Sequence, residues 1–148
     1  MTAAREGARV SRTVAAKMGL HGGCRAHLHN APAAARAVMQ LPDLHESKQL
    51  RGVFDYLHLF STRRRDLEAD LPRMTCHLST GGALWVSWPK SRQLGTNLTL
   101  PTVIEVSYQH NLVESTCLSI DPTWSALKLT RPLPGKTYAN SYGTLPSW

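Results

Sequence analysis

The chain has 148 residues, the length of one ordinary domain, and roughly two thirds of the surface of such a chain can be buried on folding. It has no apolar run of about 20 residues, so we expect a soluble protein with no membrane-spanning helix and no membrane partner. Seventeen lysines and arginines against ten acidic residues give a net charge of +7, which favours anionic partners.

The N-terminal part of the chain predicts a basic segment followed by a strand–turn–helix unit. Residues 1–20 are basic and end in "VAAKMGL", a short helical stretch closed by a turn at Gly22 and Gly23. "CRAHLHNAP" follows as a strand whose end is marked by Asn30 and Pro32. "AAARAVMQL" behind it is a good helix former, and Pro32 suits the first turn of that helix.

The next two segments predict one weak strand and one strong strand. Residues 42–52 are polar, so any strand there is expected at an edge of the sheet. "VFDYLHLF" (53–60) is apolar on both faces except for Asp55 and His58. A strand that is buried on both faces is typical of a parallel sheet covered by helices on both sides.

A helix and a second buried strand are predicted after this strand. "STRRRDLEADLPRMTCHL" predicts a helix with Ser61 or Thr62 as its N-cap and an interruption near Pro72. "STGGALWVSWP" reads as a glycine turn that leads into a buried strand over residues 83–87, which we expect beside the strand over 53–60.

The last third of the chain predicts a helix, a hairpin and a tail. "NLTLPTVIEVSYQHNL" places four apolar residues on one helical face, with a proline in the first turn: Leu100, Ile104, Tyr108 and Leu112. "STCLSI" and "ALKLT" flank "DPTWS" and predict a closing hairpin. Residues 132–148 are rich in Pro, Gly and Ser without a period, so we expect a flexible tail.

Strands that alternate with helices predict a parallel sheet with right-handed crossovers, to which the hairpin adds antiparallel strands. The predicted fold is therefore a small three-layer α/β sandwich, Rossmann-like, with a mostly parallel sheet and a C-terminal antiparallel hairpin. The expected organisation is a basic N-terminal segment (1–20), a Rossmann-like domain (21–131) and the tail (132–148).

The three cysteines indicate a reducing compartment. Cys24, Cys76 and Cys117 are odd in number, lie far apart and form no C-x-x-C pair. This pattern predicts partly buried, reduced thiols in a cytoplasmic protein rather than a disulfide framework or a zinc site.

Two segments resemble known proteins. "GVFDYLHLF" and "LSTGGALWVSWP" resemble neighbouring strands of class I S-adenosylmethionine-dependent methyltransferases. The chain is more similar still to an uncharacterised, mainly bacterial domain-of-unknown-function family of short Rossmann-like proteins. That family pairs an "ALWVSWPK"-like strand with a later "TWSxLK" segment, here residues 123–128, and the similarity covers about residues 14–131. It implies the fold and no particular activity.

The first strand-to-helix turn departs from the pattern of a cofactor-binding fold. A dinucleotide or methyl-donor site needs glycines there, so that the backbone can approach the ligand and point its amides at it. Here the turn is Asn30-Ala31-Pro32, which has no glycine and lacks one amide donor. We therefore predict no cofactor and no methyl donor in the usual position.

The predicted ligand site lies beyond the carboxyl ends of the parallel strands, where open α/β sheets bind their ligands. Four segments are expected to end at that edge, and they contribute these candidate residues: Asn30, Arg63, Arg64, Arg65, Trp88, Lys90, Asp121, Thr123 and Trp124. We expect Trp88, Lys90 and Trp124 to line one surface. At the rim of that surface, the arginines and a helix N-terminus would form an anion-binding site. The alternative is that the tryptophans are packing residues and the charges are solvated.

Metal and nucleophile sites find little support. His27 and His29 share a face of the first strand and His58 could join them, but no spacing completes a zinc site, so we predict no bound metal. Cys76 and His77 are adjacent on a predicted helix and would point apart.

The sequence thus favours a non-catalytic or weakly catalytic binding domain on a methyltransferase-like scaffold that lacks the cofactor loop. It would hold a small anionic ligand or a protein partner at the carboxyl edge of the sheet. One alternative is an enzyme that acts on a phosphorylated or carboxylated metabolite, with Asp121 as its base. Another is a basic nucleic-acid-binding accessory protein, which would need interleaved aromatic and cationic side chains.

Overall fold

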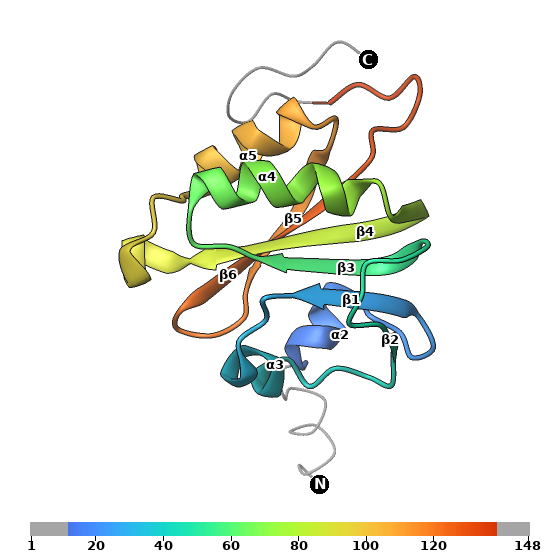
Figure 1. The fold of residues 1–148 in the computed structure, drawn as a ribbon, viewed down its shortest axis with the longest axis horizontal. Helices are drawn as coiled ribbons and strands as arrows, with labels where there is room; N and C mark the ends of the chain where they lie inside the picture. The colour runs from blue at the N-terminus through green and yellow to red at the C-terminus, as the bar shows by residue number, and fades with distance from the viewer. Residues whose placement is uncertain (1–11, 139–148) are drawn as a thin grey trace, which may run out of the picture.

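Six strands form one sheet in the order β2-β1-β3-β4-β6-β5 (Figure 1) in the computed structural model, which describes residues 12–138. The strands are β1 Arg25–His29, β2 His45–Glu46, β3 Phe54–Phe60, β4 Leu78–Pro89, β5 Val113–Ser119 and β6 Trp124–Thr130. The helices are α2 Val14–Met18, α3 Ala33–Met39, α4 Arg64–Thr75 and α5 Leu100–Gln109, with a short 3-10 segment at Lys90–Gly95.

Strand directions confirm the predicted Rossmann-like fold. Strands β2, β1, β3 and β4 are parallel to one another, whereas β6 is antiparallel to β4 and β5 is antiparallel to β6. The central pair β3 and β4 is the predicted pair of adjacent parallel strands, in a register that sets Leu57 beside Leu84 and Leu59 beside Val86. Every residue of β3 except Asp55 is buried, as a strand covered on both faces requires.

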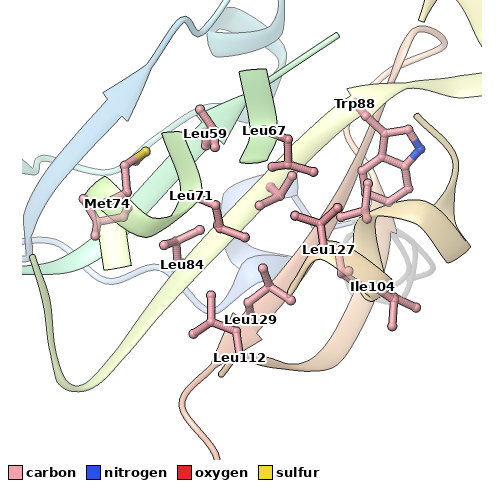
Figure 2. Close-up of a cluster of buried hydrophobic side chains, with 14 of the residues drawn as sticks. Leu59, Leu67, Leu71, Met74, Leu84, Trp88, Ile104, Leu112, Leu127 and Leu129 are labelled. Atoms are coloured by element: carbon pink, nitrogen blue, oxygen red, sulfur yellow. The ribbon is translucent and has the colours of Figure 1, made fainter. Parts of the chain in front are cut away.

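Two apolar clusters cover the two faces of this sheet. Alternate side chains such as Leu59 and Val86 point to one face, where they pack under Leu67 and Leu71 of α4 and Ile104 of α5 (Figure 2). We call this the α4/α5 face. The intervening side chains pack on the other side against α2 and α3, and we call that the α2/α3 face; its buried members include Met18, Met39, Tyr56, Phe60 and Trp85.

The predictions for the edge strand, the hairpin and the last helix are also confirmed. The polar segment 42–52 supplies only the two-residue edge strand β2. The predicted hairpin is β5 and β6. Helix α5 has Thr99 as its N-cap and a proline in its first turn, and its predicted apolar face is buried at Ile104 and Tyr108.

The start of α4 differs from the prediction. Its N-cap is Arg63, not Ser61 or Thr62, and no side chain of its own turn caps it. The backbone N–H of Ser61 donates to the carbonyl of Ser87 at 2.9 Å, so the chain still follows the sheet at the expected cap position. Instead, Asn97 Oδ1 accepts a hydrogen bond from the Arg64 amide at 2.8 Å.

Two further local predictions are wrong. Helix α4 is not interrupted near Pro72, because this proline lies close to the end of the helix and the carbonyl it leaves free belongs to the exposed residue Glu68. Nor do Gly81 and Gly82 form a turn that precedes the strand. Strand β4 starts at Leu78, and the register with β3 jumps between Leu78 and Ala83, so residues 79–82 form a bulge inside the strand.

The ends of the described chain lie against the sheet. Helix α2, inside the predicted N-terminal segment, buries Val14 and Met18, and Tyr138 of the predicted tail packs against the α4/α5 cluster. The flexibility expected for 132–148 stays a prediction, and residues 1–11 and 139–148 lie outside the described part of the chain. Within residues 12–138, no helix has the length and apolar character to span a bilayer. Cys24 is a half-buried free thiol, whereas Cys76 and Cys117 are exposed, contrary to expectation.

Candidate functional site

The two tryptophans of the predicted site lie on opposite faces of the sheet. In the antiparallel pair β4–β6, Trp88 is opposite Ser125 and Pro89 is opposite Trp124. Because successive strand residues point to opposite faces, Trp88 joins the α4/α5 cluster (Figure 2) and Trp124 packs edge-on against Phe60 of the α2/α3 cluster, with ring centroids 5.2 Å apart. Both indoles are over 90% buried. The prediction that they line one surface is wrong.

Asp121 and Thr123 build the turn between β5 and β6. Asp121 Oδ1 accepts hydrogen bonds from the backbone amides of Thr123, at 2.8 Å, and Trp124, at 2.7 Å. The Thr123 carbonyl accepts from the Lys90 amide at 2.7 Å, which ties this turn to the end of β4. This is an Asx-type turn, in which the Asp121 carboxylate stabilises the backbone of the hairpin.

Residues 90–97, which we call the edge loop, connect β4 to the start of α5 at the carboxyl edge of the parallel strands. Ser91, Arg92 and Leu94 have left-handed backbone angles, with φ of 51°, 59° and 55°. The loop is anchored on both sides. Gln93 Nε2 donates to the Pro122 carbonyl at 3.0 Å, and Thr96 Oγ1 donates to the Thr62 carbonyl at 2.6 Å.

The three consecutive arginines separate into two groups. Arg64 pairs with Glu68 at 3.1 Å and with Glu105 at 2.8 Å, and thereby links α4 to α5. These hydrogen bonds raise the pKa of the Arg64 guanidinium. Arg64 is therefore a structural ion-pair residue, contrary to its expected place at the rim. Arg63 and Arg65 are exposed and line a depression of about 400 Å³ together with the edge loop.

A second depression, of about 310 Å³, is lined in part by the start of the edge loop. Its lining includes Trp88, Lys90 and Arg92. The Lys90 ammonium donates to Ser119 Oγ. Within the described part of the chain, no carboxylate lies within ion-pair distance of Arg63, Arg65 or Arg92. We call Arg63, Arg65, Lys90 and Arg92 the basic rim. Sequence reasoning missed Arg92, which only the turn of the edge loop brings there.

The first strand-to-helix turn has the unusual form that its sequence indicates. Asn30 is exposed and left-handed, with φ of 61°, and Pro32 is the N-cap of α3 without a side-chain cap. Beside this unit, Arg36 of α3 donates to both carboxylate oxygens of Glu46 in β2, at 2.8 and 2.9 Å. The pKa of Arg36 is raised by this hydrogen bonding.

The three histidines considered for a zinc site do not converge. In the β1–β3 register His27 is beside Leu57 and His29 beside Leu59, so both imidazoles lie on the α4/α5 face. His58 lies on the opposite face. His29 Nε2 is 3.8 Å from an Asp70 oxygen, and burial lowers the His29 pKa although that carboxylate raises it.

A buried polar chain that the sequence did not indicate runs along the α2/α3 face. His58 Nδ1 is 2.5 Å from the Tyr56 hydroxyl, and His58 Nε2 is 2.7 Å from Ser87 Oγ. Burial lowers the pKa of His58 to about 3 and raises the pKa of Tyr56. Ser87 and His58 are fully buried, so no substrate reaches this serine–histidine pair and it serves the core.

Comparison with known proteins identifies the fold and nothing finer. No protein-family model matches the chain, so the resemblance to a domain-of-unknown-function family stays a prediction. No curated protein matches it.

Solved structures of methyltransferases do match. Magnesium protoporphyrin IX methyltransferase from Synechocystis PCC 6803, with bound SAM, has a TM-score of 0.55 at 10% identity, over 80% of this chain and 74% of that chain. The TehB-like SAM-dependent methyltransferase from Corynebacterium glutamicum has a TM-score of 0.51 at 10% identity, over 87% of this chain and 93% of that chain. A methyltransferase from Pyrococcus furiosus has a TM-score of 0.51 at 15% identity, over 76% of this chain and 77% of that chain. The chain thus has a methyltransferase-like fold.

Proposed function

We propose that this protein is a non-catalytic binding domain on a methyltransferase-like scaffold, and that it holds a small anionic ligand at the basic rim. The observation that carries the proposal is the presence of three exposed arginines without a carboxylate partner among residues 12–138, at the edge where open α/β sheets bind ligands. Arginine presents a planar fork of donors that matches phosphate and carboxylate, so a phosphorylated or carboxylated small molecule is the ligand class.

The geometry around the first turn supports a ligand other than the methyl donor of the fold neighbours. Pro32 removes an amide where such folds direct one at the cofactor, and Ala31 carries a side chain where they carry none. In Rossmann folds an acidic residue after the second strand binds the ribose hydroxyl. Here Glu46, at the end of β2, already accepts two hydrogen bonds from Arg36.

The other functions considered have less support. An enzyme with Asp121 as its base would need that carboxylate free, yet its Oδ1 accepts two backbone hydrogen bonds in the hairpin turn. Single-stranded nucleic acid would need exposed aromatic platforms between the cations, but Trp88 and Trp124 are buried. A protein partner with an acidic segment would bind at the same basic rim.

A thermal-shift screen tests the proposal with nucleotides, phosphosugars, S-adenosylmethionine and short oligonucleotides. We expect a small phosphate-bearing ligand to raise the melting temperature by mass action. The triple variant Arg63→Ala, Arg65→Ala, Arg92→Ala should lose that shift. Its own stability should stay within roughly 0.5 kcal/mol per substitution, because these side chains are at the surface.

The control is Arg51→Ala, which removes one exposed arginine charge from the loop before β3, at the opposite end of the parallel strands. It should keep the full ligand shift. Stabilisation by the small ligand that survives in the triple variant, or stabilisation by oligonucleotides alone, would contradict the proposal.

A further inference from the structure

A cavity lies at the amino-terminal ends of the parallel strands, opposite the end of the sheet that carries the basic rim. It has a volume of about 600 Å³, and its lining comes from the start of β4, the start of β5, the end of β6 and the C-terminal segment 132–138. Small-molecule sites in proteins typically have volumes of about 300–1,000 Å³. None of the residues assigned to the basic rim lines it, so the two regions are independent.

The bulge in β4 forms one wall of this cavity. Residues 79–82 stand opposite Asp55 alone in β3, and all four line the cavity. A Cβ atom at Gly82 would lie 2.7 Å from Ser79 Oγ and 3.1 Å from the Asp55 carbonyl oxygen, so a side chain at this position would crowd its neighbours. Gly81 has φ of +81°, a left-handed value that favours glycine, and no atom lies within 4 Å of where its Cβ would be. At Gly81 the bulge therefore presents backbone without a side chain to open space.

The remaining walls are mainly apolar. Leu78 and Val113 belong to the buried α4/α5 cluster and expose an edge of it to the cavity. Pro132, Leu133 and Pro134 of the C-terminal segment also line the cavity. Hydrocarbon of a ligand would find apolar surface on both sides.

One oriented carboxylate lies among these apolar walls. Glu114 of β5 is half-buried, and its oxygens are 2.8 and 3.0 Å from the hydroxyl of Tyr108, which donates to it. Within residues 12–138, no lysine, arginine or histidine lies within ion-pair distance of Glu114.

Two cations also line the cavity, but both are exposed and directed to other groups. Arg131 donates to the carbonyls of Thr75, at 2.8 Å, and Leu78, at 2.7 Å. The Lys136 ammonium lies 5.1 Å from the ring centre of Tyr138. Both cations are exposed, so solvent screens their charges more than it screens the charge of the half-buried Glu114.

We propose that this cavity is a second ligand site, which takes a small, mainly apolar molecule with a protonated amine. The amine would donate to Glu114, and the hydrocarbon would pack between Leu78, Val113 and the proline-rich wall. This inference does not depend on the function proposed for the basic rim.

Matched probes of one shape test this proposal. Binding of 1-naphthylmethylamine, 1-naphthalenemethanol and 1-naphthoate is measured by isothermal titration. The amine should bind about tenfold more tightly than the alcohol, the ratio typical of one added charge-assisted hydrogen bond, and the acid should bind more weakly than both. In ¹⁵N-resolved spectra of the unaltered protein, the amine should shift the amide signals of Gly81, Gly82 and Glu114.

The variant Glu114→Gln keeps an acceptor for the Tyr108 hydroxyl but removes the charge, so the amine should bind it no more tightly than the alcohol. Asp43→Asn is the matched control, since it removes an exposed carboxylate in the loop before β2, at the far edge of the sheet, and should change nothing. Equal binding of amine and alcohol to the unaltered protein, or amine-induced signal shifts that avoid the cavity, would overturn the proposal even if Glu114→Gln did not fold.

Discussion

His58 lies at the centre of the sheet, hydrogen-bonded on both ring nitrogens and stacked on Phe60 with ring centres 4.4 Å apart. A buried imidazole costs little when it is neutral and both nitrogens have partners, as Tyr56 and Ser87 provide here. In acid the same residue destabilises the folded state, because a proton on its imidazole would place a charge in the apolar core.

The buried histidine predicts acid sensitivity. The pKa of His58 is about 3 in the folded protein against 6.5 for an ordinary exposed imidazole, so the unfolded chain binds a proton at higher pH. Its contribution to stability is fully present above pH 6.5 and falls by about 1.4 kcal/mol per pH unit as the pH drops towards 3. Urea unfolding of the protein between pH 7 and pH 4 should show this slope.

His58→Phe is the variant that isolates this contribution. It should be less stable at pH 7 by about 1–3 kcal/mol for each hydroxyl that it leaves unpaired. Between pH 6.5 and pH 4 its stability should depend less on pH than that of the unaltered protein. Parallel pH profiles of the two proteins would show that another group causes the acid sensitivity.

Helix α4 depends on a cap that comes from outside the helix. The Arg64 amide, one of the donors that a helix start leaves free, is satisfied by Asn97 of the edge loop, 33 residues away in the chain. The same loop carries part of the basic rim, so the cap holds the helix start and the rim in one arrangement.

Removal of that cap should therefore have a measurable cost. Asn97→Ala is expected to lower the free energy of unfolding by about 1 kcal/mol, the typical value for a lost N-cap. Asn97→Asp keeps the accepting oxygen and adds a charge that suits the helix dipole, so it should retain the stability. Urea denaturation of the three proteins compares them. Equal losses in both variants would mean that this hydrogen bond does not stabilise α4.

As a whole, the molecule has a methyltransferase-like fold, and its first strand-to-helix turn contains no glycine. Asn30 has a left-handed backbone conformation there, and Pro32, the N-cap of α3, has no backbone N–H to donate. The fold alone therefore does not imply the cofactor, since ligands are recognised by particular groups at a site.

We expect S-adenosylmethionine not to bind at micromolar concentrations in isothermal titration. The reason is the loss of the backbone donors and of the close approach that a glycine turn provides. Micromolar binding that Ala31→Trp abolishes would contradict this expectation. Ala37→Trp, at an exposed position on the following helix α3, is the control and should leave any such binding unchanged.

The sequence by itself determined the architecture. Residues 53–60 and 83–87 are apolar on both faces, and only the interior of a helix-covered parallel sheet buries such strands. The period of α5 and the turn residues of the hairpin are equally local signals. Because parallel strands end at one edge, these elements also bring Arg63, Arg65 and Lys90 to the same side of the molecule.

Only the tertiary structure decided which side chains meet there. Trp88 and Trp124 end neighbouring strands, but the β4–β6 register sets them one residue out of phase, and a shift of one residue reverses the face of a strand side chain. Arg64 differs from its two neighbours because Glu105, 41 residues later, comes within 2.8 Å of it. Registers and ion pairs of this kind depend on contacts between distant segments, which no local pattern in the sequence encodes.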